Sequence, residues 1–382
     1  MPAVRVAPDT FLLTRKLREG LNRYAELWPG PVTAVLPPAD APPRNLDPIE
    51  VRREELNFEL KVLPYDSPEL RSLVRRAGLV HWGPHHQLHD LGDVLSEAGV
   101  PSVYVTEYSL RTRQGIITAA RPGLLRRSWR RWWEWREERK IRHNIARVSG
   151  FEANGTPTFD AYRRLNPHHH LFFDTRTTAD MIVGPEDLEA RLARAADPGR
   201  PLHLVFSGRL AEMKGALDLV DVAAALKRRG VPFRMSICGG GPLEEAMRAR
   251  AGREGLELAF RGVMPFATAL APFIRREADV FVCCHPQGDP SCTYLETFAC
   301  GVPIAGYRNE ALEGLLKRVD AGWGTPVNDP KALAGLLARL HQDRSSLPAK
   351  SRAARAFAAE RTFERTFAAR VDFFVACAAR KP

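Results

Sequence analysis

Along the C-terminal half of the chain, short runs of apolar residues take turns with segments in which apolar residues recur at regular intervals. Short apolar runs predict strands, and each is followed by a segment whose apolar residues recur every three or four positions, which predicts a helix. The predicted strands cover 203–206, 233–238, 258–261, 280–284 and 303–305. The predicted helices cover 214–229, 242–254, 266–278, 291–300 and 309–318. This alternation predicts a doubly wound parallel sheet, whose ligands bind at the carboxyl ends of its strands.

The N-terminal half follows the same α/β alternation less regularly. Helices are expected over 10–28 and 88–98, and the proline-rich stretch 37–47 is expected to be a loop. The expected strands cover 32–36, 58–63, 78–82 and 102–106. This order favours a second sheet covered by helices.

A polar, proline-flanked stretch separates the two halves. Residues 183–201 are predicted to be a linker, because few apolar positions there could join a core. The domains are then 1–182 and 202–360, and the apolar periodicity of 361–382 predicts a terminal helix.

Composition limits the class of protein. The formal net charge of +11 indicates polyanionic partners: nucleic acid, an anionic membrane surface or phosphorylated substrates. No apolar run approaches the roughly 18–20 residues that span a bilayer, and the N-terminal sequence lacks a signal-peptide pattern. The six cysteines have no metal-ligand spacing, so we expect reduced thiols and a cytoplasmic protein.

Residues 122–146 combine basic and aromatic side chains. Proline and glycine open the segment and no breaker follows, which predicts one long helix. Its marked residues are Arg126, Arg127, Trp129, Arg130, Arg131, Trp132, Trp133, Trp135, Arg136, Arg139 and Lys140. One interpretation is a surface helix whose aromatic face packs on the domain, and another is attachment to an anionic membrane surface at the inner face of the membrane. Nucleic-acid binding is the weakest, because nothing else resembles a nucleic-acid module.

Two glycine-bearing loops connect predicted strands to predicted helices. The first, SGRLAEMKG at 207–215, places Arg209 and Lys214 beside a helix N-terminus, where a pyrophosphate is bound favourably. The second, CGGGPLEE at 238–245, ends a strand in three glycines that let a ligand approach the backbone. Either loop taken alone could be an ordinary tight connection.

A third loop continues into the most informative helix of the chain. It reads HPQGDPSCTYLETFACGVPIAG over 285–306. The helix predicted from Ser291 can direct its free N–H groups at a phosphate. Glu296, about one and a half turns later, can accept hydrogen bonds from both hydroxyls of a ribose. The alternative, a solvated helix glutamate, is disfavoured because the surrounding TYLETFACG is otherwise apolar.

Together the three loops resemble the donor-binding domain of retaining family-4 glycosyltransferases of the GT-B class, the glycosyl transferases group 1. The family pattern runs GR-x-x-x-x-KG, G-x-GP, F-x-G, ADVF and E-x(7)-E. The matching positions are Gly208, Arg209, Lys214, Gly215, Gly239, Gly241, Pro242, Phe260, Gly262, Ala278, Asp279, Val280, Phe281, Glu296, Ala299, Gly301 and Pro303. The resemblance covers about 203–340. It implies two Rossmann-like domains facing across a cleft, with the last helix crossing back to the first domain.

The resemblance also implies the donor site. Arg209 and Lys214 would bind the donor diphosphate, Glu296 the ribose, and the backbone around 261–263 the base. The remaining donor-binding candidates are Gly208, Gly239, Gly240, Gly241, Arg261, Val263, Ser291, Cys292, Thr293, Tyr294 and Leu295. The substrate would be a UDP- or GDP-linked sugar, with no metal and no further cofactor.

Two positions depart from the family pattern. The first glutamate of E-x(7)-E falls on Gly288, and Asp289 is the substitute we expect to contact the donor sugar. The place of the family's catalytic histidine holds Glu107. The catalytic candidates are therefore Glu107, Asp289, Arg209 and Lys214.

The acceptor side is marked less clearly. Its candidates are His81, His85, Asn154 and Thr156. His85 and His89 have the i, i+4 spacing of a metal pair, but no third ligand is evident and a cleft-lining pair is the preferred interpretation.

The predicted function is transfer of a sugar from a nucleoside-diphosphate sugar to a hydroxyl of a glycan or lipid-linked acceptor, with retention of configuration. Polysaccharide or glycoconjugate synthesis is the expected setting. The alternatives are a non-catalytic homologue that only binds sugar nucleotides, which Gly288 and Glu107 favour, and a sugar-nucleotide epimerase on the same fold.

Overall fold

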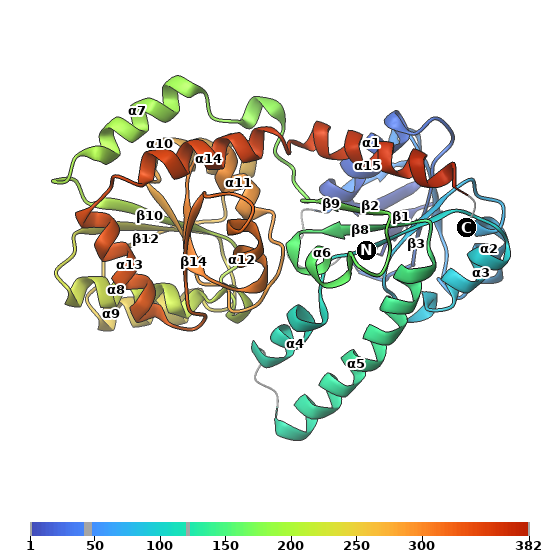
Figure 1. Cartoon of the computed structure of the whole chain (residues 1–382), viewed down its shortest axis with the longest axis horizontal. Helices are drawn as coiled ribbons and strands as arrows, with labels where there is room; N and C mark the ends of the chain where they lie inside the picture. Colours follow the sequence, from blue (N-terminus) through green and yellow to red (C-terminus); the bar gives the residue numbers. More distant parts are fainter. Residues whose placement is uncertain (1, 42–47, 120–122, 381–382) are drawn as a thin grey trace.

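The computed structural model describes residues 2–41, 48–119 and 123–380, and Figure 1 shows two α/β domains side by side. The main sheet of the N-terminal domain is parallel and has the order β6-β7-β8-β9. Its strands are β6 Val80–Trp82, β7 Ser102–Thr106, β8 Gly150–Asn154 and β9 His169–Phe172. The smaller strands β3 Thr33–Leu36 and β5 Glu59–Val62 pair in parallel. An antiparallel sheet is formed by β1 Val4–Ala7, β2 Thr10–Thr14 and β4 Pro48–Arg52.

The helices of this domain connect and cover these sheets. They are α1 Arg15–Leu27, α2 Pro68–Val74, α3 Leu91–Glu97, α4 Leu110–Ala119, α5 Leu124–Arg147 and α6 Thr156–Tyr162. Short 3₁₀ turns lie at η1 Arg53–Glu55, η2 His86–Leu88 and η3 Ala179–Met181.

The C-terminal domain is built on one six-stranded parallel sheet of order β12-β11-β10-β13-β14-β15. Its strands are β10 Leu202–Ser207, β11 Phe233–Cys238, β12 Leu258–Gly262, β13 Val280–Cys283, β14 Ile304–Tyr307 and β15 Gly322–Thr325. Its helices are α7 Pro185–Ala196, α8 Ala216–Arg228, α9 Glu244–Arg253, α10 Ala271–Glu277, α11 Thr293–Ala299, α12 Glu310–Leu316, α13 Pro330–Gln342 and α14 Leu347–Ala359, with turns η4 Glu212–Lys214 and η5 Phe266–Leu270. The order reverses between β10 and β13, which is where a doubly wound sheet binds its ligand. The predicted α/β fold class is thereby confirmed.

Some predicted elements differ from the structure. The helix expected over 10–28 begins only at Arg15, because residues 10–14 form β2 between β1 and β4. The helix expected over 266–278 is a π-helical turn followed by α10, and Pro272 lies at the start of α10. The predicted linker 183–201 contains α7, whose buried Arg191 donates to Cys300 O at 3.1 Å and so packs this helix on the C-terminal domain. Residues 42–47 of the expected loop lie outside the described residues.

The last helix, α15 Phe363–Ala378, crosses back to the N-terminal domain, as the fold class predicted (Figure 1). It packs against α1, β7 and β9. A buried ion pair holds it there, because Arg370 Nη2 lies 2.8 Å from Glu152 Oε2 on β8.

The long helix predicted over 122–146 is present as α5, while Pro122 lies outside the described residues. Trp129, Trp132, Trp133 and Trp135 remain 41–61% exposed. The interpretation in which an aromatic face packs on the domain is therefore wrong. In Figure 1, α4 and the outer part of α5 project away from the sheets.

Candidate functional site

The predicted phosphate-binding cations lie at the carboxyl end of β10. Lys214 belongs to the 3₁₀ turn before α8 and is only 9% exposed. Its ammonium contacts the Asp289 carboxylate and lies 3.4 Å from Ser291 Oγ. Arg209 is exposed, and its guanidinium makes no hydrogen bond or ion pair within the described parts of the chain. Lys214 is therefore held in place by its contacts, whereas the Arg209 guanidinium is free to bind an anionic ligand.

The glycine loops after β10 and β11 touch each other through their backbones. A Cβ on Gly239 would lie 2.0 Å from the carbonyl oxygen of Gly208, and one on Gly241 would lie 2.5 Å from that of Leu210. The Leu210 N–H donates to Gly240 O at 3.0 Å. These glycines are thus required by the close approach of two loops at the switch point of the sheet.

The residues expected near the base lie just after β12. Val263 is 81% exposed, and a Cβ on Gly240 would lie 3.3 Å from Val263 Cγ2. The guanidinium of Arg261 stacks over the Phe273 ring at 5.0 Å. An exposed apolar side chain and a glycine loop thus face the same space, which suits a flat base.

Gly288 has a steric reason to lack a side chain. A Cβ there would lie 2.7 Å from Glu310 Cβ and 2.9 Å from Thr112 Oγ1 of α4. Thr112 Oγ1 also donates to Gly288 O at 3.2 Å, and Ser109 Oγ donates to Glu310 Oε2 at 2.6 Å. Since α4 belongs to the N-terminal domain, domain packing occupies the space of the family's first glutamate.

Glu107 follows β7 and lies in the same electrostatic neighbourhood as Asp289. Its side chain is exposed to solvent, although many protein atoms lie close to its carboxyl group. Desolvation by this surrounding protein, together with the negative charges of Asp289 and Asp174, raises the pKa of Glu107 to about 7. A carboxyl group with this pKa can exchange a proton near neutral pH.

Glu296 is 5% exposed on α11 and is paired across the domains. Arg176 Nε donates to Glu296 Oε1 at 2.7 Å, and the Arg176 guanidinium stacks over Phe266 at 4.3 Å. The second carboxylate oxygen, Oε2, has no hydrogen-bond partner among the described residues, so it can accept from a ligand hydroxyl.

The structure adds Lys16 and Asp174 to the site, both of which the sequence reasoning missed. Lys16 contacts the Asp174 carboxylate, and Lys16 Nζ lies 3.1 Å from Cys292 Sγ. Burial and the Asp174 charge raise the pKa of Cys292 to about 12, so its thiol is neutral. Asp174 follows β9 closely, and that position at the carboxyl end of a parallel strand is a signal that could have found it.

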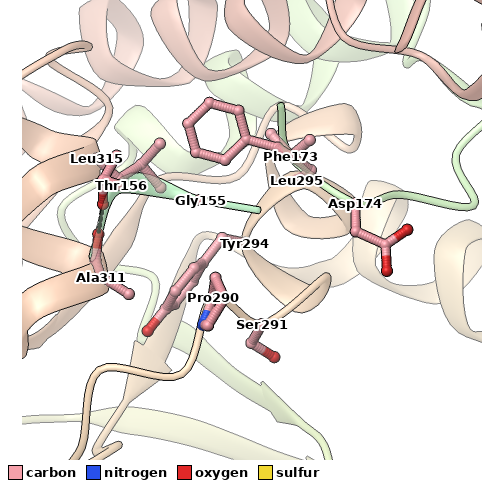
Figure 2. Close-up of a pocket in the computed structure, with 10 residues that line it drawn as sticks. All are labelled: Gly155, Thr156, Phe173, Asp174, Pro290, Ser291, Tyr294, Leu295, Ala311 and Leu315. Atoms are coloured by element: carbon pink, nitrogen blue, oxygen red, sulfur yellow. Dashed lines mark hydrogen bonds between the residues drawn. The ribbon is translucent and has the colours of Figure 1, made fainter. Parts of the chain in front are cut away.

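A small cavity of about 10 Å³ lies between the domains (Figure 2). Figure 2 shows Thr156 beside Ala311, to whose carbonyl oxygen Thr156 Oγ1 donates at 3.2 Å. Tyr294 lines the same cavity with its side chain 5% exposed. Asn154 Oδ1 accepts from the Asp174 N–H at 3.0 Å and so orients the segment carrying that carboxylate.

The remaining α11 candidates divide by burial. Leu295 is 3% exposed and belongs to the core, so only its backbone could reach a donor. Thr293 Oγ1 accepts from Ser291 Oγ at 3.2 Å at the first residue of α11. Ser291 and Cys292 are the side chains of this segment that reach the two lysines, Ser291 at Lys214 and Cys292 at Lys16.

The two histidine candidates contact other groups than these residues. His81 on β6 points to the buried Glu152, with its Nε2 3.3 Å from Glu152 Oε2. His85 Nδ1 accepts from Gln87 N, and His89 Nε2 lies 2.7 Å from Glu137 Oε2. No group of three possible metal ligands occurs within residues 2–41, 48–119 and 123–380.

Comparisons with known proteins agree on the class. Residues 191–359 match the family model of glycosyl transferases group 1. The putative colanic acid biosynthesis glycosyltransferase WcaL of Salmonella typhimurium is 31% identical over 149 residues, 37% of this chain and 36% of that protein. The GDP-mannose-dependent alpha-(1-6)-phosphatidylinositol dimannoside mannosyltransferase of Mycobacterium tuberculosis is 34% identical over 131 residues, 34% of this chain and 33% of that protein. The matched stretch thus spans about a third of the length of these relatives.

The likeness to solved structures extends over both domains. The crystal structure of Anabaena HepE in complex with UDP superposes with a TM-score of 0.66 at 15% identity, covering 94% of this chain and 95% of that chain. Similarity at this level of identity shows the fold, which is GT-B.

Proposed function

We propose that this chain, whose residues 191–359 match the family model of glycosyl transferases group 1 and whose domains have the GT-B fold, is a retaining nucleotide-sugar-dependent glycosyltransferase. One observation carries the proposal. Arg209, Lys214 and Glu296 lie on the loops and helix that follow β10 and β13, at the switch point of a parallel sheet. Two cations and a carboxylate in that place suit a diphosphate and a ribose.

The donor is a uridine or guanosine diphosphate sugar. HepE was solved with UDP, and the mycobacterial relative is named as GDP-mannose-dependent. Lys214 has three ammonium donors; with one directed at Asp289 and another near Ser291, one remains for a phosphate oxygen. Arg209 supplies a second positive charge from the exposed side of the same loop.

In the transfer step the bond between the anomeric carbon and the leaving diphosphate oxygen breaks, while a bond forms from the acceptor oxygen on the same face of the sugar. The acceptor proton passes to the leaving diphosphate. Arg209 and Lys214 stabilise the charge that develops on this leaving group. Asp289 holds Lys214 with one carboxylate oxygen and offers the other to a sugar hydroxyl, and Glu107 orients the sugar or the acceptor from the opposite domain.

The acceptor is a glycan or a lipid-linked saccharide, and polysaccharide or glycoconjugate synthesis is the proposed setting. WcaL is named for the biosynthesis of such a polysaccharide. Asn154 and Thr156 are 6% and 1% exposed, so they would support the acceptor side of the site from within the N-terminal domain rather than touch the acceptor.

Gly288 supports one second candidate, a homologue that binds sugar nucleotides without turnover. Its Cβ position is filled by Thr112 and Glu310, so the family's glutamate cannot be accommodated there.

A thermal-shift screen against uridine and guanosine nucleotides, their sugar conjugates and adenosine controls tests the donor assignment. A ligand at about one hundred times its dissociation constant should add about 2.7 kcal/mol of stability. Stabilisation by a UDP- or GDP-sugar supports the proposal, and no response to any of them contradicts it. Release of nucleoside diphosphate from the best donor then separates the enzyme from the binding protein.

A further inference from the structure

The outer half of α5 exposes large apolar side chains that no part of the described chain covers. Leu124 and Leu125 are 80% and 90% exposed, and Trp129 is 61% exposed. Trp132 and Trp133 follow at helical spacing and are 50% and 41% exposed. Exposed apolar side chains grouped on one element mark an interaction surface rather than ordinary scatter.

The inner half of α5 is firmly attached to the N-terminal domain. Ile141 and Ile145 are buried in its core. Glu138 accepts from Arg113 Nη2 at 2.8 Å and from Tyr162 OH at 2.7 Å, and Glu134 accepts from Arg113 Nε at 2.7 Å. Arg113 lies on α4, so these contacts hold α4 against α5, and the two helices project from the domain together as the α4–α5 hairpin (Figure 1).

The charges of α5 are distributed unevenly between its inner and outer halves. The helix carries nine basic residues and three glutamates. All three glutamates contact basic partners, Glu137 through His89 and the other two through Arg113. Residues 124–133 contain four arginines and no carboxylate. The projecting end is therefore both basic and apolar.

From this combination we propose that the α4–α5 hairpin docks the protein on an anionic lipid bilayer. Leucine and tryptophan side chains enter the boundary between headgroups and acyl chains, while the arginines extend to lipid phosphates. Tryptophan favours this interfacial depth because one part of its ring system is apolar and its N–H is polar. The proposal is independent of glycosyl transfer.

The geometry favours a bilayer over nucleic acid. The Arg139 guanidinium lies 3.8 Å from the centre of the Trp135 ring, and Arg136 lies 5.0 Å from that of Trp132. Trp129 and Trp133 stack on each other with centroids 6.1 Å apart. Ring faces already occupied in this way are poorly placed to stack with bases. None of the described helices is long and apolar enough to cross a membrane, so docking would be at the surface.

Vesicle co-sedimentation of the whole chain tests the proposal. We expect at least tenfold tighter binding to vesicles of phosphatidylcholine with 30% phosphatidylglycerol than to pure phosphatidylcholine, and weaker binding in 0.5 M NaCl than in 0.05 M NaCl. Equal binding to the two vesicle types, or no binding, overturns the proposal.

Charge-matched variants locate the surface. Arg126→Glu with Arg130→Glu should lower anionic-vesicle binding at least tenfold, because each arginine near the surface contributes separately. Arg253→Glu with Lys331→Glu changes the net charge equally on exposed positions of the C-terminal domain and should leave binding unchanged. If both double variants lost vesicle binding equally, net charge alone would explain the binding, and the assignment to α5 would be overturned.

An aromatic variant separates insertion from simple attraction. Trp129→Ser with Trp133→Ser should weaken vesicle binding with no loss of melting temperature, since both rings are exposed. Binding to a 20-mer oligonucleotide that exceeds vesicle binding, or a dimer in sedimentation velocity that these substitutions dissociate, would overturn the proposal in favour of those partners.

Discussion

Arg209 offers the cleanest perturbation of the proposed phosphate site. Its side chain is exposed and makes no hydrogen bond or ion pair with any described residue, so Arg209→Ala should change the free energy of unfolding by less than about 0.5 kcal/mol. A charge-assisted hydrogen bond to a diphosphate contributes about 1.5–3 kcal/mol. The dissociation constant for the nucleoside diphosphate should therefore rise by about tenfold to 150-fold.

Lys214→Ala should give the contrasting result. Lys214 neutralises Asp289, which is 8% exposed, and removing one partner of a buried ion pair costs about 3–5 kcal/mol of stability. This variant should lose both stability and affinity, whereas Arg209→Ala loses affinity alone.

Isothermal calorimetry and urea unfolding of both variants provide the two measurements. Arg253→Ala, at the far end of α9, is the matched control and should change neither quantity. Wild-type affinity in a folded Arg209→Ala variant would refute the reasoning that places the diphosphate beside this loop.

Three further predictions follow from individual positions. The pKa of Glu107 lies above its ordinary value, so the folded state loses stability as the pH rises toward 7 and this carboxyl group ionises. Glu107→Gln should therefore raise the melting temperature more at pH 8 than at pH 5, and equal shifts would contradict this. Gly288→Ala places a methyl group against Glu310 and Thr112 and should cost about 1–3 kcal/mol in urea unfolding; an unchanged midpoint would show that α4 can move away. Glu296→Gln should weaken UDP or GDP binding but leave pyrophosphate binding intact, and parallel losses would exclude a ribose contact.

Five of the six strands of the C-terminal sheet could be predicted from the sequence because their signals are local. Each of the five is an apolar run bounded by a breaker, and the helices between them repeat their apolar face every three or four residues. The sixth strand, β15, was missed because its sequence, GWGT, has two glycines among four residues. The triple glycine after β11 marked a loop in the sequence, but its cause is not local, because a Cβ on Gly239 would meet the carbonyl oxygen of Gly208 in another loop.

The parts of the site that escaped prediction depend on domain packing. Lys16 and Cys292 are 276 positions apart in the sequence, yet their polar atoms lie 3.1 Å apart. Arg176 reaches Glu296 across the domains in the same way. No spacing rule within one segment can indicate such pairs, because their proximity arises only when the two sheets are placed side by side.

The α5 helix shows a different limit. Its length was predictable because proline and glycine open the segment and no breaker follows, but whether its tryptophans were covered depended on the direction in which the helix leaves the domain. The contacts of Arg113 with Glu134 and Glu138 fix that direction, and they join residues whose pairing the sequence does not reveal.

Proton NMR of donor hydrolysis, with water as the acceptor, tests the central claim most directly. The chain is incubated with the α-linked UDP- or GDP-sugar that stabilises it best, and the first-formed anomer of the free sugar is observed before mutarotation. We predict enzyme-dependent release of the α anomer, and Arg209→Ala should lower this release together with nucleotide affinity. Release of the β anomer would contradict retention, and no release with any donor that binds would contradict glycosyl transfer itself.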